Sequence, residues 1–176
     1  MDEQDGQDER EVTSSVTNRR PSMGIEEPVV AGFNALYRSE QSTMVRLAHQ
    51  IVGSNAEAED LVHDAFIELH RRWDDVVNPG GYLRTAVVNR CLSRMRRRRL
   101  EWRNRHLTPP PVSAPEYDDM WHALESTTPR QRAALVLRYY DDLTVDEIAQ
   151  VMQTRPGTVK SLIHRGLKKL EEVVES

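Results

Sequence analysis

Residues 143–170, LTVDEIAQVMQTRPGTVKSLIHRGLKKL, contain two helix-forming segments joined by a short turn. In the first segment, Thr144 and Glu147 have the spacing of a capping box, in which each side chain bonds the other residue's free backbone N–H. Pro156 suits the first position of the second helix, because the missing proline N–H needs no partner there. The segment therefore predicts a helix-turn-helix, a unit that can place its second helix in the major groove of DNA.

The second predicted helix separates apolar residues from polar and cationic ones. Its buried stripe is predicted to be Val159, Leu162, Ile163, Leu167 and Leu170. Its DNA-facing residues are predicted to be Thr158, Lys160, Ser161, His164, Arg165 and Lys168, and Arg155 in the turn just before the helix is predicted to join them. No acidic residue lies between residues 155 and 170, which favours DNA over the alternative of a merely solvated helical hairpin. Many kinds of regulator share this unit, so a second signal is needed.

The first half of the chain supplies a second helical unit. Residues 33–76 predict two amphipathic helices separated by a Gly-Ser-Asn break, and Ser54 with Glu57 has the spacing of another capping box. A third helix is predicted over residues 82–99, with a strongly basic end. Four of its arginines share one face by their spacing: Arg90, Arg94, Arg97 and Arg98. Such a patch attracts a phosphate backbone.

Composition and charge favour an all-α protein with two small helical domains joined by a proline-containing linker. We predict an acidic, disordered tail over residues 1–32, helical domains over 33–103 and 118–176, and a stiff linker over 104–117. The net charge of −4 is unevenly distributed, because the tail contains 3 basic and 8 acidic residues whereas residues 33–107 contain 13 and 9. The first helical domain is therefore cationic despite the acidic total.

Several classes of function have no support in the sequence. The single cysteine, Cys91, excludes an internal disulfide and a cysteine-cluster metal site, and we expect it to be a small buried residue. His63 and His70 share a helical face without a third metal ligand spaced to join them. We find no phosphate-binding glycine loop and no nucleophile motif, so we expect no enzyme activity, no cofactor and no metal. No membrane span or secretion signal is present, which predicts a cytoplasmic protein.

Three motifs in order resemble the sigma factors of bacterial RNA polymerase, specifically the compact extracytoplasmic-function (ECF) type. The motifs are AEAEDLVHDAFIEL at residues 56–69, GYLRTAVVNRCLSRMRRRR at 81–99, and the helix-turn-helix. The resemblance covers residues 33–174. It implies a protein that binds core RNA polymerase and directs initiation at promoters, with the second domain on the −35 duplex and the first on the melted −10 strand.

The resemblance also assigns roles to residues of this chain. The six polar residues of the second helix and Arg155 before it would contact the −35 duplex, and Asn89 with the four arginines would hold the single-stranded −10 element. The resemblance places core-polymerase binding on three acidic residues: Glu59, Asp60 and Asp64. It also allows an inhibitory anti-sigma partner. The alternative function is a stand-alone helix-turn-helix regulator, which would normally need a dimer interface or a sensor domain.

Two residues of the helix-turn-helix depart from the family's usual pattern. Gln153 occupies a turn position where the family often has glycine, so a left-handed backbone there would carry modest strain. Arg155 stands where a capping serine is common, and an arginine side chain cannot cap the helix in that way. We therefore expect either that the second helix starts slightly differently or that Arg155 contacts a phosphate directly.

Overall fold

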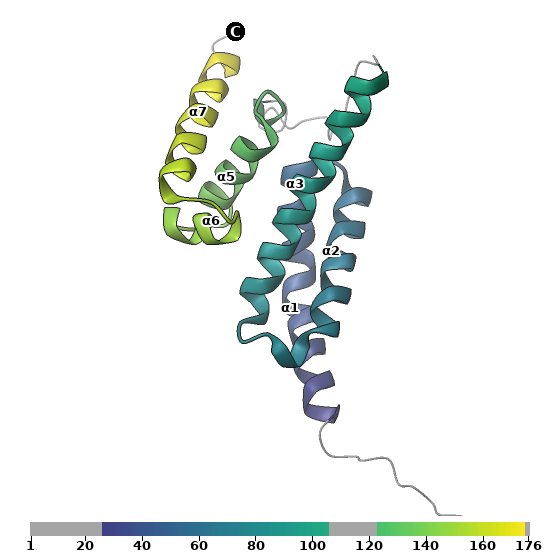
Figure 1. The fold of residues 1–176 in the computed structure, drawn as a ribbon. Helices are drawn as coiled ribbons and strands as arrows, with labels where there is room; N and C mark the ends of the chain where they lie inside the picture. The colour runs from purple at the N-terminus through teal and green to yellow at the C-terminus, as the bar shows by residue number, and fades with distance from the viewer. Residues whose placement is uncertain (1–25, 106–122, 175–176) are drawn as a thin grey trace, which may run out of the picture.

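A computed structural model describes residues 26–105 and 123–174, and every regular element in those two ranges is helical. The order is α1 (Glu26–Val52), α2 (Asn55–Arg71), a 3-10 turn η1 (Trp73–Asp75), α3 (Pro79–Arg105), α5 (Pro129–Tyr139), α6 (Val145–Val151) and α7 (Pro156–Val174). Helices α1, α2 and α3 form one bundle, and α5, α6 and α7 form a second group beside it (Figure 1). The predicted all-α fold with two helical domains is therefore confirmed.

The observed helix ends differ from the predicted ones in the first domain. Helix α1 begins at Glu26, earlier than the predicted start at residue 33, and Pro28 is tolerated because backbone N–H groups of a first turn need no helical acceptor. Helix α3 begins at Pro79, where the side chain of Asn78 accepts the Gly81 N–H at 3.0 Å. It continues to Arg105. Most of the predicted tail (residues 1–25) and linker (106–117) lies outside the described residues.

Side-chain caps fix the start of three helices. Thr144 and Glu147 form the predicted reciprocal box at α6, with the Thr144 N–H donating to Glu147 Oε2 at 2.8 Å. Thr128 and Gln131 form an equivalent box at α5, which was not predicted. At α2 only half of the predicted box is present, because Ser54 accepts the Glu57 N–H while the Glu57 carboxylate binds Arg94 of α3. A partner on another helix thus competes with local capping.

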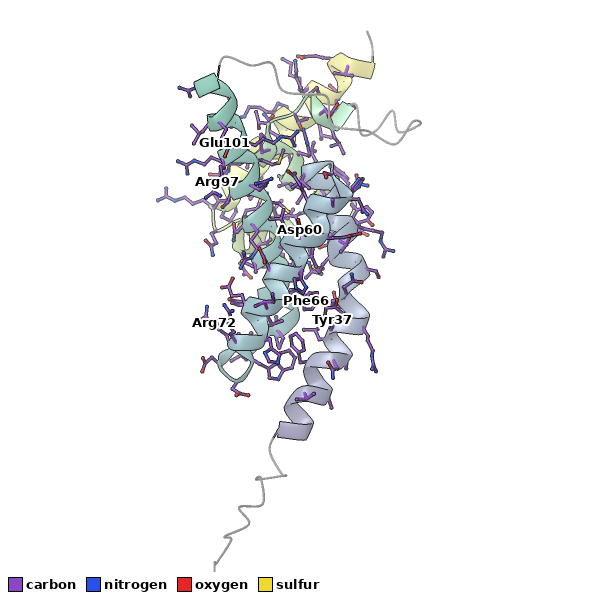
Figure 2. All side chains as sticks on the ribbon, turned by 90° about the vertical axis from the view of Figure 1, so that its right-hand side faces the viewer. Tyr37, Asp60, Phe66, Arg72, Arg97 and Glu101 are labelled. Atoms are coloured by element: carbon purple, nitrogen blue, oxygen red, sulfur yellow. The ribbon has the colours of Figure 1, made fainter. Side chains whose placement is uncertain are left out.

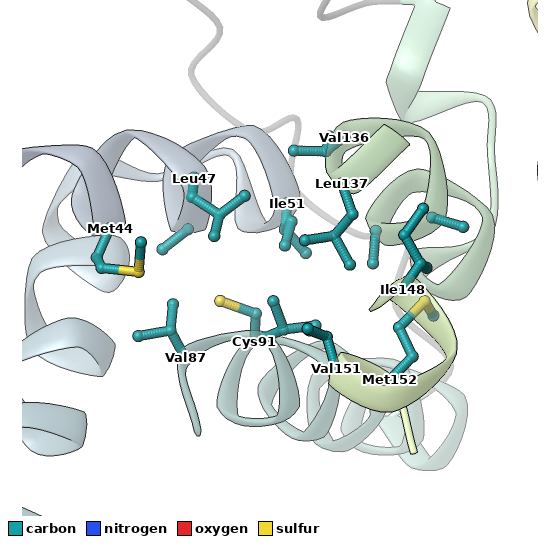
Figure 3. Close-up of a cluster of buried hydrophobic side chains, with 14 of the residues drawn as sticks. Met44, Leu47, Ile51, Val87, Cys91, Val136, Leu137, Ile148, Val151 and Met152 are labelled. Carbon is teal, nitrogen blue, oxygen red and sulfur yellow. The ribbon is translucent and has the colours of Figure 1, made fainter. Parts of the chain in front are cut away.

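The apolar residues of both domains form one continuous core. From the first domain it includes Met44, Leu47, Ile51, Val87 and Cys91, all without solvent exposure. From the second domain it includes Val136, Leu137, Ile148, Val151 and Met152. Figure 3 shows the two sets facing each other between α1, α3, α5 and α6. We predicted separate small domains, and their cores merge because α7 leaves one face of α5 and α6 to be covered by the bundle.

Helix α7 is held against α5 at close range. A Cβ atom at Gly166 would lie 2.8 Å from Leu135 Cδ1, so glycine allows the two helices to approach this closely. The predicted stripe faces the same way, with Val159 and Leu162 buried and Ile163, Leu167 and Leu170 partly buried. Packing of this face fixes which side of α7 remains available to a partner.

Candidate nucleic-acid interface

The outer face of α7 is polar and accessible. All seven residues predicted to meet duplex DNA are exposed: Arg155, Thr158, Lys160, Ser161, His164, Arg165 and Lys168. Two of them also bond the helix backbone, since the Ser161 hydroxyl donates to the Gly157 carbonyl at 3.0 Å and Arg165 Nε donates to the Ser161 carbonyl at 3.1 Å. The second bond bends the Arg165 side chain along the helix and leaves its two terminal nitrogens for other partners.

The turn before α7 has the strained geometry that the sequence suggested. Gln153 has φ of 49°, in the left-handed region that favours glycine. The turn is closed by a hydrogen bond from Thr154 N–H to the Ala149 carbonyl at 2.9 Å. Arg155 contributes its carbonyl, which accepts the Thr158 N–H at 2.9 Å, while its side chain points to solvent. The side chain of Arg155 therefore remains available for a phosphate.

Asn89 lies on α3, partly buried at the edge of two hollows. One has a volume of about 530 Å³ and is lined by Asn89, Arg90, Tyr82, Arg72 and Glu68, together with Gln153 from the turn before α7. An amide, an aromatic ring and guanidinium groups around one cavity offer hydrogen bonds, stacking and charge to an unstacked base. Tyr82, Arg72 and Glu68 were not predicted as site residues, because nothing local in the sequence places α2, η1 and α3 together.

A hydrogen-bonded network organises this hollow. The Tyr82 hydroxyl donates to Glu68 Oε1 at 2.6 Å, and Arg90 Nη2 donates to Glu68 Oε2 at 2.6 Å. Arg72 donates to the Tyr82 hydroxyl oxygen at 3.3 Å and lies 5.4 Å from the ring centroid. The bonds from Tyr82 and Arg90 lower the pKa of Glu68, whereas the bond to Glu68 raises the pKa of Tyr82. The network therefore fixes the position of α2 relative to α3 beside Asn89.

The four predicted −10 arginines do not all face the same way. Arg90 pairs with Glu68, Arg94 Nη2 lies 2.9 Å from Glu57 Oε1, and Arg98 Nη1 lies 3.8 Å from Glu57 Oε2. Arg97 is exposed and makes no ion pair within residues 26–105 and 123–174. It lies far along α3 from the Arg72 end (Figure 2). Phosphates must therefore compete with α2 carboxylates for three of the four guanidinium groups.

The acidic residues predicted to bind polymerase lie together on the exposed face of α2. Glu59, Asp60 and Asp64 are all exposed, and Asp60 is labelled in Figure 2. Glu59 accepts a hydrogen bond from the Asn55 side chain at 2.9 Å, and Asp64 lies 3.9 Å from Arg90. Asp64 thus lies at the border between the acidic face of α2 and the basic face of α3.

The structure also brings the two predicted DNA surfaces close together. Asn89 of α3 and Arg165 of α7 line one hollow of about 510 Å³, which also includes Arg96, Arg99 and the start of α5. The domains are also joined by an ion pair between Arg84 Nε and Asp141 Oδ2 at 2.6 Å. Sequence patterns gave no signal for this pairing, because the two residues lie in different domains.

The described residues offer neither a metal-binding cluster nor a membrane-spanning helix. Within the described residues, no group of three or more His, Cys, Asp or Glu side chains could hold a metal ion. Cys91 is buried as predicted, and burial raises the pKa of its thiol to about 12. None of the described helices combines the length and apolar character needed to cross a bilayer.

Comparison with known families and solved structures identifies both domains. Residues 36–101 match the family model for sigma-70 region 2, and residues 117–170 match that for sigma-70 region 4. The solved structure of the sigma factor RpoE from Bartonella quintana, in complex with the anti-sigma factor NepR, shares the fold with a TM-score of 0.67 at 22% identity, covering 82% of this chain and 97% of that one. The structure of CnrH in complex with the cytosolic domain of CnrY has a TM-score of 0.61 at 19% sequence identity. The match covers 85% of this chain and 94% of that one.

Relatives of known function agree with these matches. The RNA polymerase sigma-E factor of Streptomyces avermitilis is 30% identical over 156 residues, which cover 84% of this chain and 87% of that protein. The ECF RNA polymerase sigma factor SigE of Mycolicibacterium smegmatis is 29% identical, covering 84% and 63%. Two sigma regions in one chain argue against a stand-alone regulator. The chain belongs to the sigma-70 family of RNA polymerase sigma factors and is of the extracytoplasmic-function type.

Proposed function

We propose that this sigma factor divides promoter recognition between α7 and α3. As a sigma factor the chain binds core RNA polymerase and directs it to initiate at promoters. In our proposal the exposed face of α7 contacts the −35 duplex in the major groove, through Lys160, Ser161, His164 and Arg165 on bases or phosphates. Thr158 would join them, and Arg155 and Lys168 would hold phosphates. The accessible outer face of α7, which has no acidic residue as far as residue 170, is the observation that supports this role.

We propose that Asn89 binds an unstacked base of the melted −10 strand. The hollow beside Asn89 supplies the aromatic ring of Tyr82 and the guanidinium of Arg72, which suit a flipped base. Arg97 is available to a phosphate, whereas Arg90, Arg94 and Arg98 would have to exchange carboxylates of α2 for phosphates. These three arginines therefore have a structural role that the sequence did not suggest.

Core polymerase would bind the exposed acidic face of α2. Glu59, Asp60 and Asp64 offer a cluster of negative charge to a basic surface. We propose that the protein acts with polymerase in the cytoplasm, catalyses no reaction itself and needs no cofactor. The RpoE and CnrH structures were solved with anti-sigma partners, so we also propose that an anti-sigma factor regulates this chain. The proposed domain limits are residues 33–103 and 118–176, joined by the linker over 104–117.

The two-site assignment can be tested by promoter opening. Core polymerase and the purified chain would be incubated with a library of promoter duplexes, and a base-reactivity probe would detect melted strands. We expect opening only when both proteins are present. Asn89→Ala should abolish opening after the duplex is bound, whereas Lys160→Ala and Arg165→Ala should weaken binding upstream.

Matched variants control for general damage. Lys169→Ala alters a cation of α7 that pairs with Glu172 at 2.9 Å, and Asn34→Ala alters an exposed amide of α1. Neither substitution should affect promoter opening. Selective opening that is unchanged by Asn89→Ala would contradict the assignment of α3, and tight selective binding without polymerase would contradict the function itself.

A further inference from the structure

Four arginines from three helices line one hollow of about 510 Å³ between the two domains. Helix α3 supplies one side of the hollow, and the second domain supplies the other (Figure 1). The arginines are Arg96 and Arg99 of α3, Arg130 of α5 and Arg165 of α7, and all four are exposed. None of the described residues that line the hollow is acidic. Arg96, Arg99 and Arg130 have no part in the proposed promoter contacts.

Neighbouring carboxylates do not neutralise these charges. Arg96, Arg99 and Arg130 make no ion pair within residues 26–105 and 123–174. On another face of α3, by contrast, Arg90 and Arg94 bind carboxylates of α2 at 2.6 Å and 2.9 Å. Like charges that share a hollow repel one another, although water and salt weaken the repulsion. An anion that enters the hollow would relieve this repulsion and gain the attraction of all four cations.

The arginine side chains, rather than the start of α5, provide this charge. At α5 the Thr128 hydroxyl already accepts the Gln131 N–H at 3.4 Å, and Pro129 has no N–H to offer. Arg165 Nε donates to the Ser161 carbonyl, which leaves its two terminal nitrogens for a ligand. A guanidinium presents planar N–H donors that match two oxygens of one phosphate. Several guanidinium groups around one hollow therefore favour a ligand with more than one phosphate.

Apolar side chains also line the hollow, and phosphates alone would not need them. They are Leu92 and Met95 of α3 and Met152 and Leu162 of the second domain. Methionine thioethers make favourable contacts with aromatic rings. Asn89 lies in the same lining, and its amide has no hydrogen-bond partner within the described residues, so it can bond the edge of a base. The lining thus suits an aromatic base as well as phosphates.

The size of the hollow limits what can enter it. Its volume of about 510 Å³ lies within the range of about 300–1,000 Å³ that is usual for small-molecule sites. A DNA duplex, whose major groove alone is about 12 Å wide, is too large for it. A single nucleotide is compact and combines an aromatic base with adjacent phosphates.

We propose that this hollow is a binding site for a nucleoside polyphosphate. The phosphates contact Arg96, Arg99 and Arg130, and the base lies against the apolar lining beside Asn89. The site goes beyond the proposed function, because promoter recognition does not require it. One consequence does rest on that function: since Asn89 and Arg165 also line the hollow, a bound nucleotide would compete with promoter DNA for both residues.

Nucleotide binding to the purified full chain can be measured by isothermal titration calorimetry. The probes are ATP and GTP, with tripolyphosphate to test the phosphates alone and adenosine to test the base alone. We expect saturable binding of at least one of the two nucleotides, with one ligand per chain. Tripolyphosphate should bind more weakly than that nucleotide, and adenosine should not bind measurably. Absence of binding by both nucleotides would overturn the proposal.

Substitutions of the arginines test the location of the site. Arg96→Gln, Arg99→Gln and Arg130→Gln should each weaken nucleotide binding by about tenfold, because each removes charge-assisted hydrogen bonds to a phosphate. Arg103→Gln is the matched control, because it removes the same charge from an exposed position of α3 outside the hollow. Circular dichroism would verify that all four variants keep their helices. An equal loss of affinity in Arg103→Gln would overturn the site, because it would mean general attraction to a cationic protein.

Competition with DNA separates the site from the proposed function. The nucleotide should lower the affinity of the wild-type chain for a mixed-sequence single-stranded oligonucleotide, and it should do so less in Arg99→Gln. If the nucleotide binds as predicted but leaves DNA affinity unchanged, the site is supported and the shared roles of Asn89 and Arg165 are overturned. If tripolyphosphate binds as tightly as the nucleotide, the hollow binds phosphates only and the nucleotide assignment is wrong.

Discussion

Arg90 on α3, which directly follows Asn89 in the sequence, donates a hydrogen bond from Nη2 to Glu68 Oε2 on α2 at 2.6 Å. The same carboxylate accepts the hydroxyl of Tyr82, so one acidic residue orients both a cation and an aromatic ring at the proposed −10 surface. A base-binding amide benefits from a rigid surround, because less order has to be gained when the strand binds. Glu68 is therefore a positioning residue in our interpretation.

Glu68→Gln should destabilise the protein by about 1 kcal/mol near neutral pH, because a neutral amide bonds Arg90 and Tyr82 less strongly. The folded-state pKa of Glu68 is lowered by the bonds from Tyr82 and Arg90. The contribution of ionised Glu68 to the free energy of unfolding should therefore be present above the ordinary glutamate pKa. It should be lost as the pH falls through the lower pKa of the folded state. Urea unfolding at neutral and acidic pH measures this. A difference between variant and wild type that grows on acidification would contradict the prediction.

Gln153→Gly should stabilise the protein by about 0.5–1 kcal/mol, since the φ of 49° strains glutamine but not glycine. Part of the gain is offset by the greater freedom of glycine in the unfolded chain. Thermal unfolding checks the sign. Gln150→Gly in α6 is the control, and it should instead destabilise by about 0.5–1 kcal/mol because the residue is helical and exposed.

Asp60→Lys should reduce affinity for core polymerase by at least about tenfold, because it places a cation on the acidic face of α2 against a basic partner. The affinity should also become less dependent on salt. Fluorescence anisotropy of the labelled chain with core polymerase measures both effects. Glu171→Lys reverses an exposed charge on α7 and should leave polymerase affinity unchanged. Equal losses in the two variants would mean a general charge effect.

Arg132→Lys should destabilise the protein by about 1–3 kcal/mol, although it keeps the positive charge. A single ammonium cannot reproduce the planar arrangement with which the guanidinium reaches the carbonyls of Leu124, Glu125 and Ile51. Burial already lowers the pKa of Arg132 to about 10, and a buried lysine loses its proton more easily. Chemical denaturation measures this loss in the free energy of unfolding. Arg130→Lys, at an exposed position on the same helix, should have almost no effect.

Local sequence patterns predicted much of the helix-turn-helix correctly. The Thr144 box and the start of α7 at Pro156 depend on residues a few positions apart, whereas the left-handed backbone at Gln153 had been considered only as a condition for strain. The exposed face of α7 follows from helical periodicity, because its apolar stripe has to pack against α5 and α6. The roles that we assign to this face stay predictions until DNA binding is measured.

The sequence by itself determined which segments are helical and which face of each is apolar, because caps and amphipathic spacing act between neighbouring turns. Only the tertiary structure decided that the Glu57 carboxylate would bind Arg94 across 37 residues of chain rather than complete its own cap. It also decided that Arg132 would bond the carbonyl of Ile51, 81 residues away, and that Arg84 would meet Asp141. The packing of buried helix faces selects these partners. The sequence alone offers many exposed charged residues as possible partners and does not choose among them.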